Sequence, residues 1–552
     1  MIYPTIPLAQ SIMQICLSKG ITDIVISPGS RNAPLTIGFA SNPEFTCYSI
    51  ADERSAAFFG MGMAQQLKKP VALLCTSGSA LLNYYPAVAE AFYSQIPLIV
   101  ISADRPHDKI DIGDGQTIRQ ENVYANHILF SANLTEEASA ENDFLINKAI
   151  AVARIEKGPV HINAPFEEPL YNTVDEATVQ VEVQYAPIEV KQLREDITLY
   201  ARQWNAAKKK LVLVGVNDPG MIGQEVIDYL AADPSIVVMT ETTSNLHNDS
   251  FLNSIDTIIT PFTPEDFEAW KPEILLTFGG MVVSKRVKAW LRKYAPQRHW
   301  HVDSLRAYDT YGALTKHFEA DPHVFFESFL PLVHTVESIY KQLAIDTKAY
   351  RKVKHDEYLQ TIPFTDFTVF AKTFSALPDG VQLQIGNSSA IRYAQLFDIK
   401  PSVEVYCNRG TSGIDGSTST AVGAAVASGK PTVVITGDVS FLYDSNALWN
   451  NYIPKDFKIL LINNAGGGIF RILPGHNETP VFNTFFETTH NHTAEHLAKM
   501  FGFNYLTATD ELSLEGSLKA FFGDSQKPAI LEVFTPMREN DKILLDYFKY
   551  IK

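Results

Sequence analysis

Short, largely apolar runs recur along the chain, and they constrain its fold more than any other feature. Each run is rich in β-branched residues and precedes a glycine- or serine-rich turn, after which a stretch with helical periodicity begins. Strands that are apolar throughout are buried on both faces, which is typical of a parallel sheet covered by helices. We therefore predict an α/β fold, with strands at residues 22–27, 70–75, 97–102, 210–215, 274–278, 431–436 and 457–462.

The pattern lapses twice, and these lapses predict the domain boundaries. Residues 172–195 are polar and extended, and residues 335–365 form a charged stretch with the character of a surface helix. At about 150 residues per domain, a chain of this length forms three or four compact units. We predict three doubly wound domains with mostly parallel sheets, at residues 1–180, 181–350 and 351–552. The first and last could be distant structural copies of each other.

Composition and charge exclude several classes of protein. Hydrophobic residues make up 46% and charged residues 20%, as in a soluble globular protein. The net charge of −16 opposes a general role in binding nucleic acid or anionic membrane. No signal peptide or stretch of about 18 apolar residues occurs, so we expect a cytoplasmic protein with no stable membrane insertion. The four cysteines are scattered and show no metal spacing, which indicates reduced, mostly buried thiols.

Two strand ends in the last third carry groups suited to a metal ion. Asp438 follows one predicted strand and Asn464 follows the next, and ligands of open parallel sheets bind at such ends. A carboxylate, an amide oxygen and a glycine carbonyl are hard ligands that suit Mg²⁺ or Ca²⁺ beside a diphosphate. An Asx turn capping a helix at each strand end explains the same residues equally well.

Gly437-Asp438 together with Asn463-Asn464 resembles the metal-binding signature of the thiamin-diphosphate-dependent enzymes. The resemblance implies a thiamin-diphosphate-binding fold, with Mg²⁺ or Mn²⁺ held by Asp438, Asn464 and the carbonyl of Gly466. It also implies a pyrimidine-binding (PYR) domain at 1–180, a central Rossmann-like domain at 181–350 and a diphosphate-binding (PP) domain at 351–552.

Besides the metal-binding signature, the family has a catalytic glutamate, and Glu53 matches its position. Its members use a glutamate to hydrogen-bond the aminopyrimidine ring, which can then remove the C2 proton of the thiazolium. Glu53 follows the run Phe45–Ile50 and begins an apolar helical stretch, where the resemblance implies this catalytic glutamate. By itself, a glutamate in the first turn of a helix is more often a surface residue that interacts with the helix dipole.

Further motifs resemble a menaquinone-biosynthesis branch of the family, in order and over nearly the whole chain. That resemblance implies a transferase that decarboxylates 2-oxoglutarate and makes a 1,4-addition of the succinyl carbanion equivalent to isochorismate. It further implies a homodimer or dimer of dimers with active sites at the interface. The motifs are SPGSRNAPL (27–35), DERSA (52–56), TSGSA (76–80), SADRP (102–106), QTIRQ (116–120), SKR (284–286), GNS (386–388) and NRGTSGIDG (408–416).

The charges agree with two dicarboxylate substrates and a diphosphate, because such ligands require concentrated arginine in an acidic protein. Any one of these arginines, taken alone, is more often a solvated surface charge or part of an ion pair. By resemblance, the isochorismate-binding residues are Ser30, Arg31, Arg105, Lys285 and Arg286. Those for the part derived from 2-oxoglutarate are Gln116, Ser388, Arg392 and Arg409.

By resemblance, Ile414 is wedged between the two cofactor rings, and Ile469 and Phe470 line the same pocket. Taken alone, an isoleucine is more often a core residue, but the position of Ile414 between Gly413 and Asp415 favours a loop role. Three histidines, His476, His490 and His492, are expected to be ordinary polar loop residues.

Alternative functions remain open at the level of the sequence. An acetolactate-synthase-like carboligase or a 2-oxo-acid decarboxylase would require an FAD site or a paired histidine. The chain has no His-His pair, and residues 215–223 do not match the GxGxxG fingerprint. A degenerate relative that only binds or regulates is a third possibility, against which the retention of Glu53, Asp438 and Asn464 argues.

Overall fold

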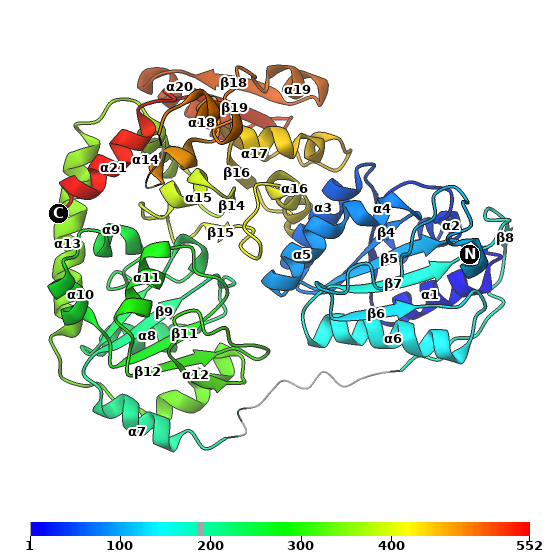
Figure 1. Ribbon diagram of the computed structural model, residues 1–552, viewed down its shortest axis with the longest axis horizontal. Helices are drawn as coiled ribbons and strands as arrows, with labels where there is room; N and C mark the ends of the chain where they lie inside the picture. The colour runs from blue at the N-terminus through cyan, green and yellow to red at the C-terminus, as the bar shows by residue number, and fades with distance from the viewer. Residues whose placement is uncertain (1, 185–192, 194, 474, 476) are drawn as a thin grey trace.

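Three parallel sheets organise the chain, as a computed structural model shows for residues 2–184, 193, 195–473, 475 and 477–552. Predicted residue His476 lies outside these described residues, as does part of the 172–195 stretch. The α/β prediction is confirmed, because the strands of each of the three large sheets pair in parallel. Figure 1 shows the first sheet set apart from the other two, with helices around each.

The first sheet has the strand order β3-β2-β4-β5-β7-β6, and a short antiparallel pair, β1 and β8, lies beside it. Its elements are β1 Tyr3–Pro4, α1 Pro7–Ser18, β2 Asp23–Ile26, α2 Ala33–Ala40, β3 Thr46–Ser49, α3 Glu53–Leu67, β4 Val71–Cys75, α4 Ser79–Asn83, α5 Tyr85–Ser94, β5 Leu98–Asp104, η1 His107–Lys109, β6 Phe130–Asn133, α6 Ala140–Ile155, β7 Val160–Pro165 and β8 Thr173–Val174.

The middle sheet has the order β10-β9-β11-β12-β13. Its elements are α7 Thr198–Ala206, β9 Lys210–Val214, α8 Gln224–Ala232, β10 Ile236–Met239, η2 Thr242–Ser244, α9 Ile255–Ile259, α10 Pro264–Trp270, β11 Ile274–Phe278, α11 Lys285–Lys293, β12 Arg298–Val302, β13 Leu314–Phe318, α12 Pro322–Phe329, η3 Leu330–Leu332 and α13 Tyr340–Leu359.

The third sheet, β15-β14-β16-β17-β19-β18, repeats the connectivity of the first, which supports the interpretation of the two as structural copies. Its elements are α14 Asp366–Ala376, β14 Gln382–Ile385, α15 Ser389–Ala394, β15 Glu404–Tyr406, α16 Ser417–Ser428, β16 Thr432–Gly437, α17 Asp438–Tyr443, η4 Ser445–Leu448, β17 Phe457–Asn463, η5 Gly468–Ile472, α18 Pro480–Phe485, α19 Glu495–Met500, β18 Asn504–Ala508, α20 Glu511–Phe522, β19 Ala529–Phe534 and α21 Asn540–Tyr550.

Helices α3 and α16 join the first and third domains. A Cβ built on Gly62 would lie 2.0 Å from the carbonyl oxygen of Thr420, and one built on Gly423 would lie 1.9 Å from that of Phe59. The absence of a side chain at both glycines therefore allows the two backbones to approach. A single apolar core runs across this contact and includes residues of both helices. Figure 1 shows the two helices side by side between the domains.

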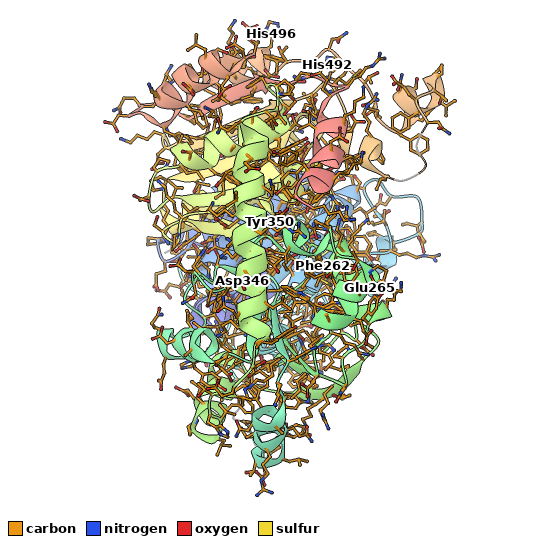
Figure 2. All side chains as sticks on the ribbon, turned by 90° about the vertical axis from the view of Figure 1, so that its left-hand side faces the viewer. Phe262, Glu265, Asp346, Tyr350, His492 and His496 are labelled. Atoms are coloured by element: carbon orange, nitrogen blue, oxygen red, sulfur yellow. The ribbon has the colours of Figure 1, made fainter. Side chains whose placement is uncertain are left out.

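Helix α13 spans the predicted boundary at residue 350. Its first turns pack on the middle domain through Tyr340 and Ala344, and its last turn packs on the third through Tyr358. Figure 2 shows the helix along one side of the molecule, with Asp346 and Tyr350 labelled. The ranges 1–180, 181–350 and 351–552 stay a proposal for the domain limits, and each contains one of the large sheets.

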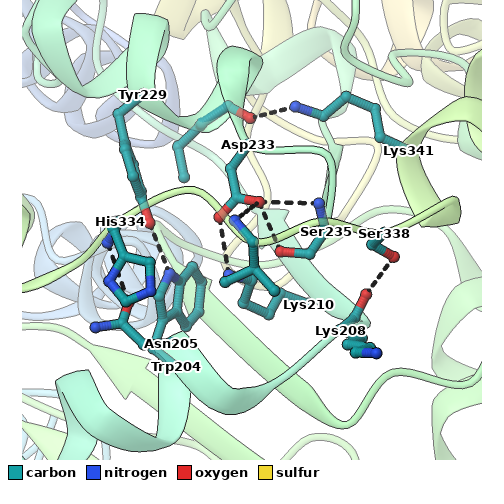
Figure 3. A network of polar contacts seen from close by, with 12 residues as sticks. Trp204, Asn205, Lys208, Lys210, Tyr229, Asp233, Ser235, His334, Ser338 and Lys341 are labelled. Atoms are coloured by element: carbon teal, nitrogen blue, oxygen red, sulfur yellow. Dashed lines mark hydrogen bonds and ion pairs between the residues drawn. The ribbon is translucent and has the colours of Figure 1, made fainter.

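A buried ion pair fixes the segment that leads into α13. Lys210 and Asp233 are fully buried, and Lys210 Nζ lies 2.8 Å from Asp233 Oδ2 (Figure 3). Asp233 also accepts hydrogen bonds from Ser235 and from the backbone N–H of Val336. Lys341 then donates to two carbonyl groups at the end of α8. Because Asp233 bonds both Lys210 of β9 and the backbone of Val336, the pair holds the segment before α13 against the middle sheet.

All four cysteines are free, and three of them are buried, as expected. Among the described residues, no helix is both long and apolar enough to cross a membrane.

Candidate active site

Asp438 and the glycine-rich loop after β17 meet at the carboxyl edge of the third sheet. Asp438 is 3% exposed, and its Oδ2 accepts a hydrogen bond of 3.0 Å from the N–H of Gly466. Its Oδ1 accepts from the N–H of Val439 at 2.7 Å, as in the Asx alternative. Burial raises the pKa of Asp438 to about 6. A cation at this edge would offset the cost of the buried charge.

Asn464 is oriented by an aspartate that the sequence analysis missed. Asn464 Nδ2 donates to Asp366 Oδ2 at 3.0 Å, which leaves the amide oxygen for another partner. Asp366 is buried, and its second oxygen accepts a hydrogen bond of 2.5 Å from Thr535. Asp366 belongs to no local motif and begins α14, almost a hundred residues from Asn464, so no sequence signal pointed to it.

The donor set fits a hard divalent cation. Asp438, Asn464 and Gly466 offer oxygen ligands, and such ligands suit Mg²⁺ or Mn²⁺. In the described part of the chain, no group of three or more His, Cys, Asp or Glu side chains is arranged to hold a metal. A His490 ring nitrogen lies 3.3 Å from Asp438 Oδ2, so this histidine is closer to the site than its prediction as an ordinary loop residue implied.

The third-domain arginines lie close together. Burial lowers the pKa of Arg392, Asp256 opposes that shift, and Arg409 adds to it. Arg409 donates to Asn387 Oδ1 at 2.7 Å. The Nε atoms of Arg392 and Arg409 are buried without a hydrogen-bond partner among the described residues. Buried donors of this kind are normally satisfied, so both point to a ligand. Ser388 is the N-cap residue of the helix that carries Arg392.

Lys285 and Arg286 are exposed and occupy the first two positions of α11. Cations are unfavourable at a helix N-terminus, because the helix dipole places partial positive charge there. Asp256 lies near Arg286 and Arg392, and it accepts a hydrogen bond from Ser284, the N-cap residue of α11. The middle domain therefore adds two positive charges on the side that faces the third domain.

The first-domain residues form a second group. Arg31 is buried and donates to the Phe166 carbonyl at 3.0 Å and to Glu168 at 3.2 Å. Burial lowers the pKa of Arg31, and the nearby Arg105 lowers it further. Arg105 donates to the carbonyl of Gly115 and keeps a buried Nε without a partner among the described residues.

Two further predicted residues of this domain are exposed, Ser30 and Gln116. Within the described ranges, no hydrogen bond or ion pair joins Ser30, Arg31, Arg105 or Gln116 to the third-domain group.

Glu53 is the first residue of α3, and Asp52 caps that helix. Glu53 is partly exposed and accepts a hydrogen bond of 3.3 Å from Asn83. The residues on either side of Glu53 reach the third domain, because Asn446 donates to Asp52 and Arg54 donates to the carbonyl of Tyr443. The glutamate therefore lies at the joint between the two outer domains.

The predicted apolar residues are half-buried. Ser440 donates to the carbonyl of Ile414 at 2.6 Å, which holds the Ile414 loop beside α17. Ile469 and Phe470 lie in η5, directly after the glycine-rich loop, and Phe470 packs against Phe486. All three side chains lie near the Asp438 edge rather than in the deep core.

Glu90 is a second residue that the sequence analysis did not identify. It is 2% exposed, and its carboxylate accepts hydrogen bonds of 2.6 Å from the N–H groups of Gly410 and Thr411. It therefore anchors the loop of Arg409 and Ile414 on helix α5 of the first domain. A single charge within the apolar run PAVAEAF was the signal available in the sequence.

Two cavities adjoin these groups. A cleft of about 660 Å³ opens at the strand ends of the middle sheet, and Arg409 and Lys288 line it together with first-domain residues. A much smaller cavity is lined by Asp366, Arg392 and Asn464. Of the predicted site residues, Arg409 lines the larger cleft, and Arg392 and Asn464 line the smaller cavity.

Comparison with known proteins matches nearly the whole chain. Residues 6–125 match the N-terminal TPP binding domain of thiamine pyrophosphate enzymes, residues 188–385 the middle domain, and residues 384–533 the C-terminal TPP binding domain. Thiamine pyrophosphate is another name for thiamin diphosphate.

Several relatives share one name, 2-succinyl-5-enolpyruvyl-6-hydroxy-3-cyclohexene-1-carboxylate synthase. The protein of Flavobacterium psychrophilum is 65% identical over 549 residues, and that of Flavobacterium johnsoniae is 64% identical over 552 residues, each with 100% of both chains covered. That of Phocaeicola vulgatus is 39% identical, with 97% of this chain and 96% of the relative covered. The chain belongs to the thiamine pyrophosphate enzyme family, within the group of 2-succinyl-5-enolpyruvyl-6-hydroxy-3-cyclohexene-1-carboxylate synthases.

Proposed function

We propose that this protein uses thiamin diphosphate and Mg²⁺ to decarboxylate 2-oxoglutarate and to join the remaining four-carbon unit to isochorismate by 1,4-addition. The products are CO₂ and 2-succinyl-5-enolpyruvyl-6-hydroxy-3-cyclohexene-1-carboxylate, the compound in the printed name of its relatives. The observation that carries the choice of dicarboxylate substrates is the pair Arg392 and Arg409, whose buried Nε atoms have no partner among the described residues.

Asp438, Asn464 and the carbonyl of Gly466 hold the metal ion, and Asp366 keeps the Asn464 amide oxygen turned toward it. Bound thiamin diphosphate supplies the carbon nucleophile and takes up the negative charge that loss of CO₂ leaves. Glu53 holds a proton at the aminopyrimidine ring, as a general acid–base partner in a site closed to water. Ile414 packs between the rings, and Ile469 and Phe470 exclude water.

The cationic side chains bind the substrates. Guanidinium groups bind carboxylates through two parallel hydrogen bonds, which fixes both position and orientation. Arg392 and Arg409, with Ser388 and Gln116, hold the part derived from 2-oxoglutarate. The isochorismate-binding residues are Ser30, Arg31, Arg105, Lys285 and Arg286.

The assembly is a homodimer or a dimer of dimers in the cytoplasm, with each active site between two chains. This part of the proposal rests on the family to which the chain belongs, since within one chain hydrogen bonds already join Asp52 to Asn446 and Glu90 to Gly410 across the two outer domains.

The substrate preference separates this proposal from the acetolactate-synthase-like and simple decarboxylase alternatives. With thiamin diphosphate, Mg²⁺ and isochorismate present, CO₂ release is expected from 2-oxoglutarate and not from pyruvate. Release from pyruvate with formation of acetolactate, or from 2-oxoglutarate with free succinic semialdehyde as the main product, would reject the proposed function.

A further inference from the structure

The turn after β10 contains a buried carboxylate for which the proposed function assigns no role. Glu241 is 3% exposed. Its Oε2 accepts a hydrogen bond of 2.6 Å from the N–H of Val283, and its Oε1 accepts one of 2.7 Å from that of Ser284. Within its own turn, the backbone N–H of Glu241 donates to Ser244 Oγ, and the N–H of Ser244 donates to the backbone carbonyl of Glu241. A buried charge held by donors from a second loop fixes one loop relative to the other.

The loop held by Glu241 leads directly into Lys285 and Arg286. Ser284 is the N-cap residue of α11 and also donates to Asp256. The two carboxylates, Glu241 and Asp256, therefore lie at a helix N-terminus that begins with two cations. Their negative charge offsets the unfavourable combination of the cations with the helix dipole.

The same turn also forms hydrogen bonds with the third domain. Asn245 exchanges hydrogen bonds of 2.9 and 2.8 Å with the backbone of Val405 in β15, the strand that leads to Arg409. The N–H of Thr242 donates to Gln395, which follows the helix that carries Arg392. This turn therefore contacts the segments next to both pairs of cationic residues, Lys285 with Arg286 and Arg392 with Arg409.

We propose that Glu241 is a positioning residue that sets Lys285 and Arg286 at a fixed distance from Arg392 and Arg409. The two substrates must lie within bonding distance of each other, so a shift between the pairs would misplace one carboxylate ligand relative to the other. The inference rests on the proposed function, because it takes these four side chains as the substrate-binding groups.

Glu241→Gln keeps the shape of the side chain but presents an NH₂ group to the backbone N–H donors. Loss of positioning should raise the KM for isochorismate by about 10-fold and also lower kcat at saturation, because the bound isochorismate is misplaced relative to the part derived from 2-oxoglutarate. Asp143→Asn is the matched control, since Asp143 is also buried and accepts a backbone N–H, but in the first domain. Its KM should equal that of the wild type.

The pH profile gives a readout that a purely structural role would not change. Burial raises the pKa of Glu241 to about 7, with Asp256 adding to the shift and Arg409 opposing it. Lys288, Tyr311 and Cys407 are further titratable groups that interact with it. As the pH falls through about 7, Glu241 takes up a proton, so the wild-type KM should rise. In Glu241→Gln the KM should stay high and nearly constant over that range.

Calorimetric titration of isochorismate without 2-oxoglutarate tests the positioning role of Glu241 separately from the proposed function, because binding is measured without turnover. The expected result is binding that is about 10-fold weaker in Glu241→Gln than in the wild type or Asp143→Asn. An inactive wild type that binds isochorismate with this difference would reject the proposed function and keep the positioning role. Equal affinity in the three proteins, or no binding to any of them, would overturn the role of Glu241.

Discussion

The side chains at the carboxyl edge of the third sheet carry the metal part of the account. Asp438 is buried next to the backbone of Gly466, and no arginine or lysine forms an ion pair with it in the described part of the chain. Its residue type and strand-end position could be predicted from the sequence. The partner of Asn464, Asp366, could not be predicted, because that contact depends on how the start of α14 lies beside the loop after β17.

Asp438→Ala should lower Mg²⁺-dependent affinity for thiamin diphosphate by ~100-fold or more, because loss of even an outer partner of a metal ligand costs about 10- to 100-fold. The diphosphate loses its counter-charge while the fold persists. Calorimetric titration measures this loss. The control is Asp524→Ala, at an exposed turn, which should bind as the wild type does. Unchanged affinity in Asp438→Ala would leave Asp438 as an Asx cap.

Glu53→Gln should slow hydrogen–deuterium exchange at C2 of the bound cofactor by at least ~100-fold, the usual scale of a lost acid–base partner. Exchange is followed by NMR after acid quench. Glu141→Gln tests the alternative of a helix-dipole role, because Glu141 is an exposed first-turn glutamate of α6. If both variants exchange at the wild-type rate, Glu53 is a surface residue.

At the scale of elements, the sequence predicted the buried strands well and the contacts between domains poorly. Strands such as β4, β11 and β16 match their predicted ranges to within one residue, because burial on both faces makes them apolar throughout. The edge strands β6, β13 and β18 lack that signal. The packing of α3 on α16 depends on two glycines about 360 residues apart, and nothing local to either indicates its partner.

Gly62→Ala should destabilise the protein by about 1–3 kcal/mol, because the added methyl group meets the Thr420 carbonyl oxygen in a packed contact. Chemical denaturation followed by circular dichroism measures the change. Gly516→Ala is the matched helical control, since a Cβ there meets nothing within 4 Å. That control should gain about 0.5–1 kcal/mol. A neutral Gly62→Ala would contradict the close approach of α3 and α16.

At the scale of the whole molecule, the proposed placement of each active site between two chains predicts subunit complementation. Glu53→Gln and Asp438→Ala homodimers should each be inactive, because every site lacks one required group. A mixed dimer contains one site with both groups intact, so an equilibrated mixture should recover about a quarter of wild-type activity. Subunit exchange is verified with differently tagged chains. Exchange without recovery would show that each site is built within one chain.

The composition of the product tests the central claim most directly. The purified protein is incubated with thiamin diphosphate, Mg²⁺, isochorismate and 2-oxoglutarate labelled with ¹³C at C2 to C5, the four carbons that remain after loss of the C1 carboxylate. The product is analysed by mass spectrometry. We predict one CO₂ released per adduct formed, and an adduct whose mass equals the sum of both substrates less CO₂, with all four labelled carbons retained. CO₂ release without that adduct, or an adduct without the label, would contradict the account.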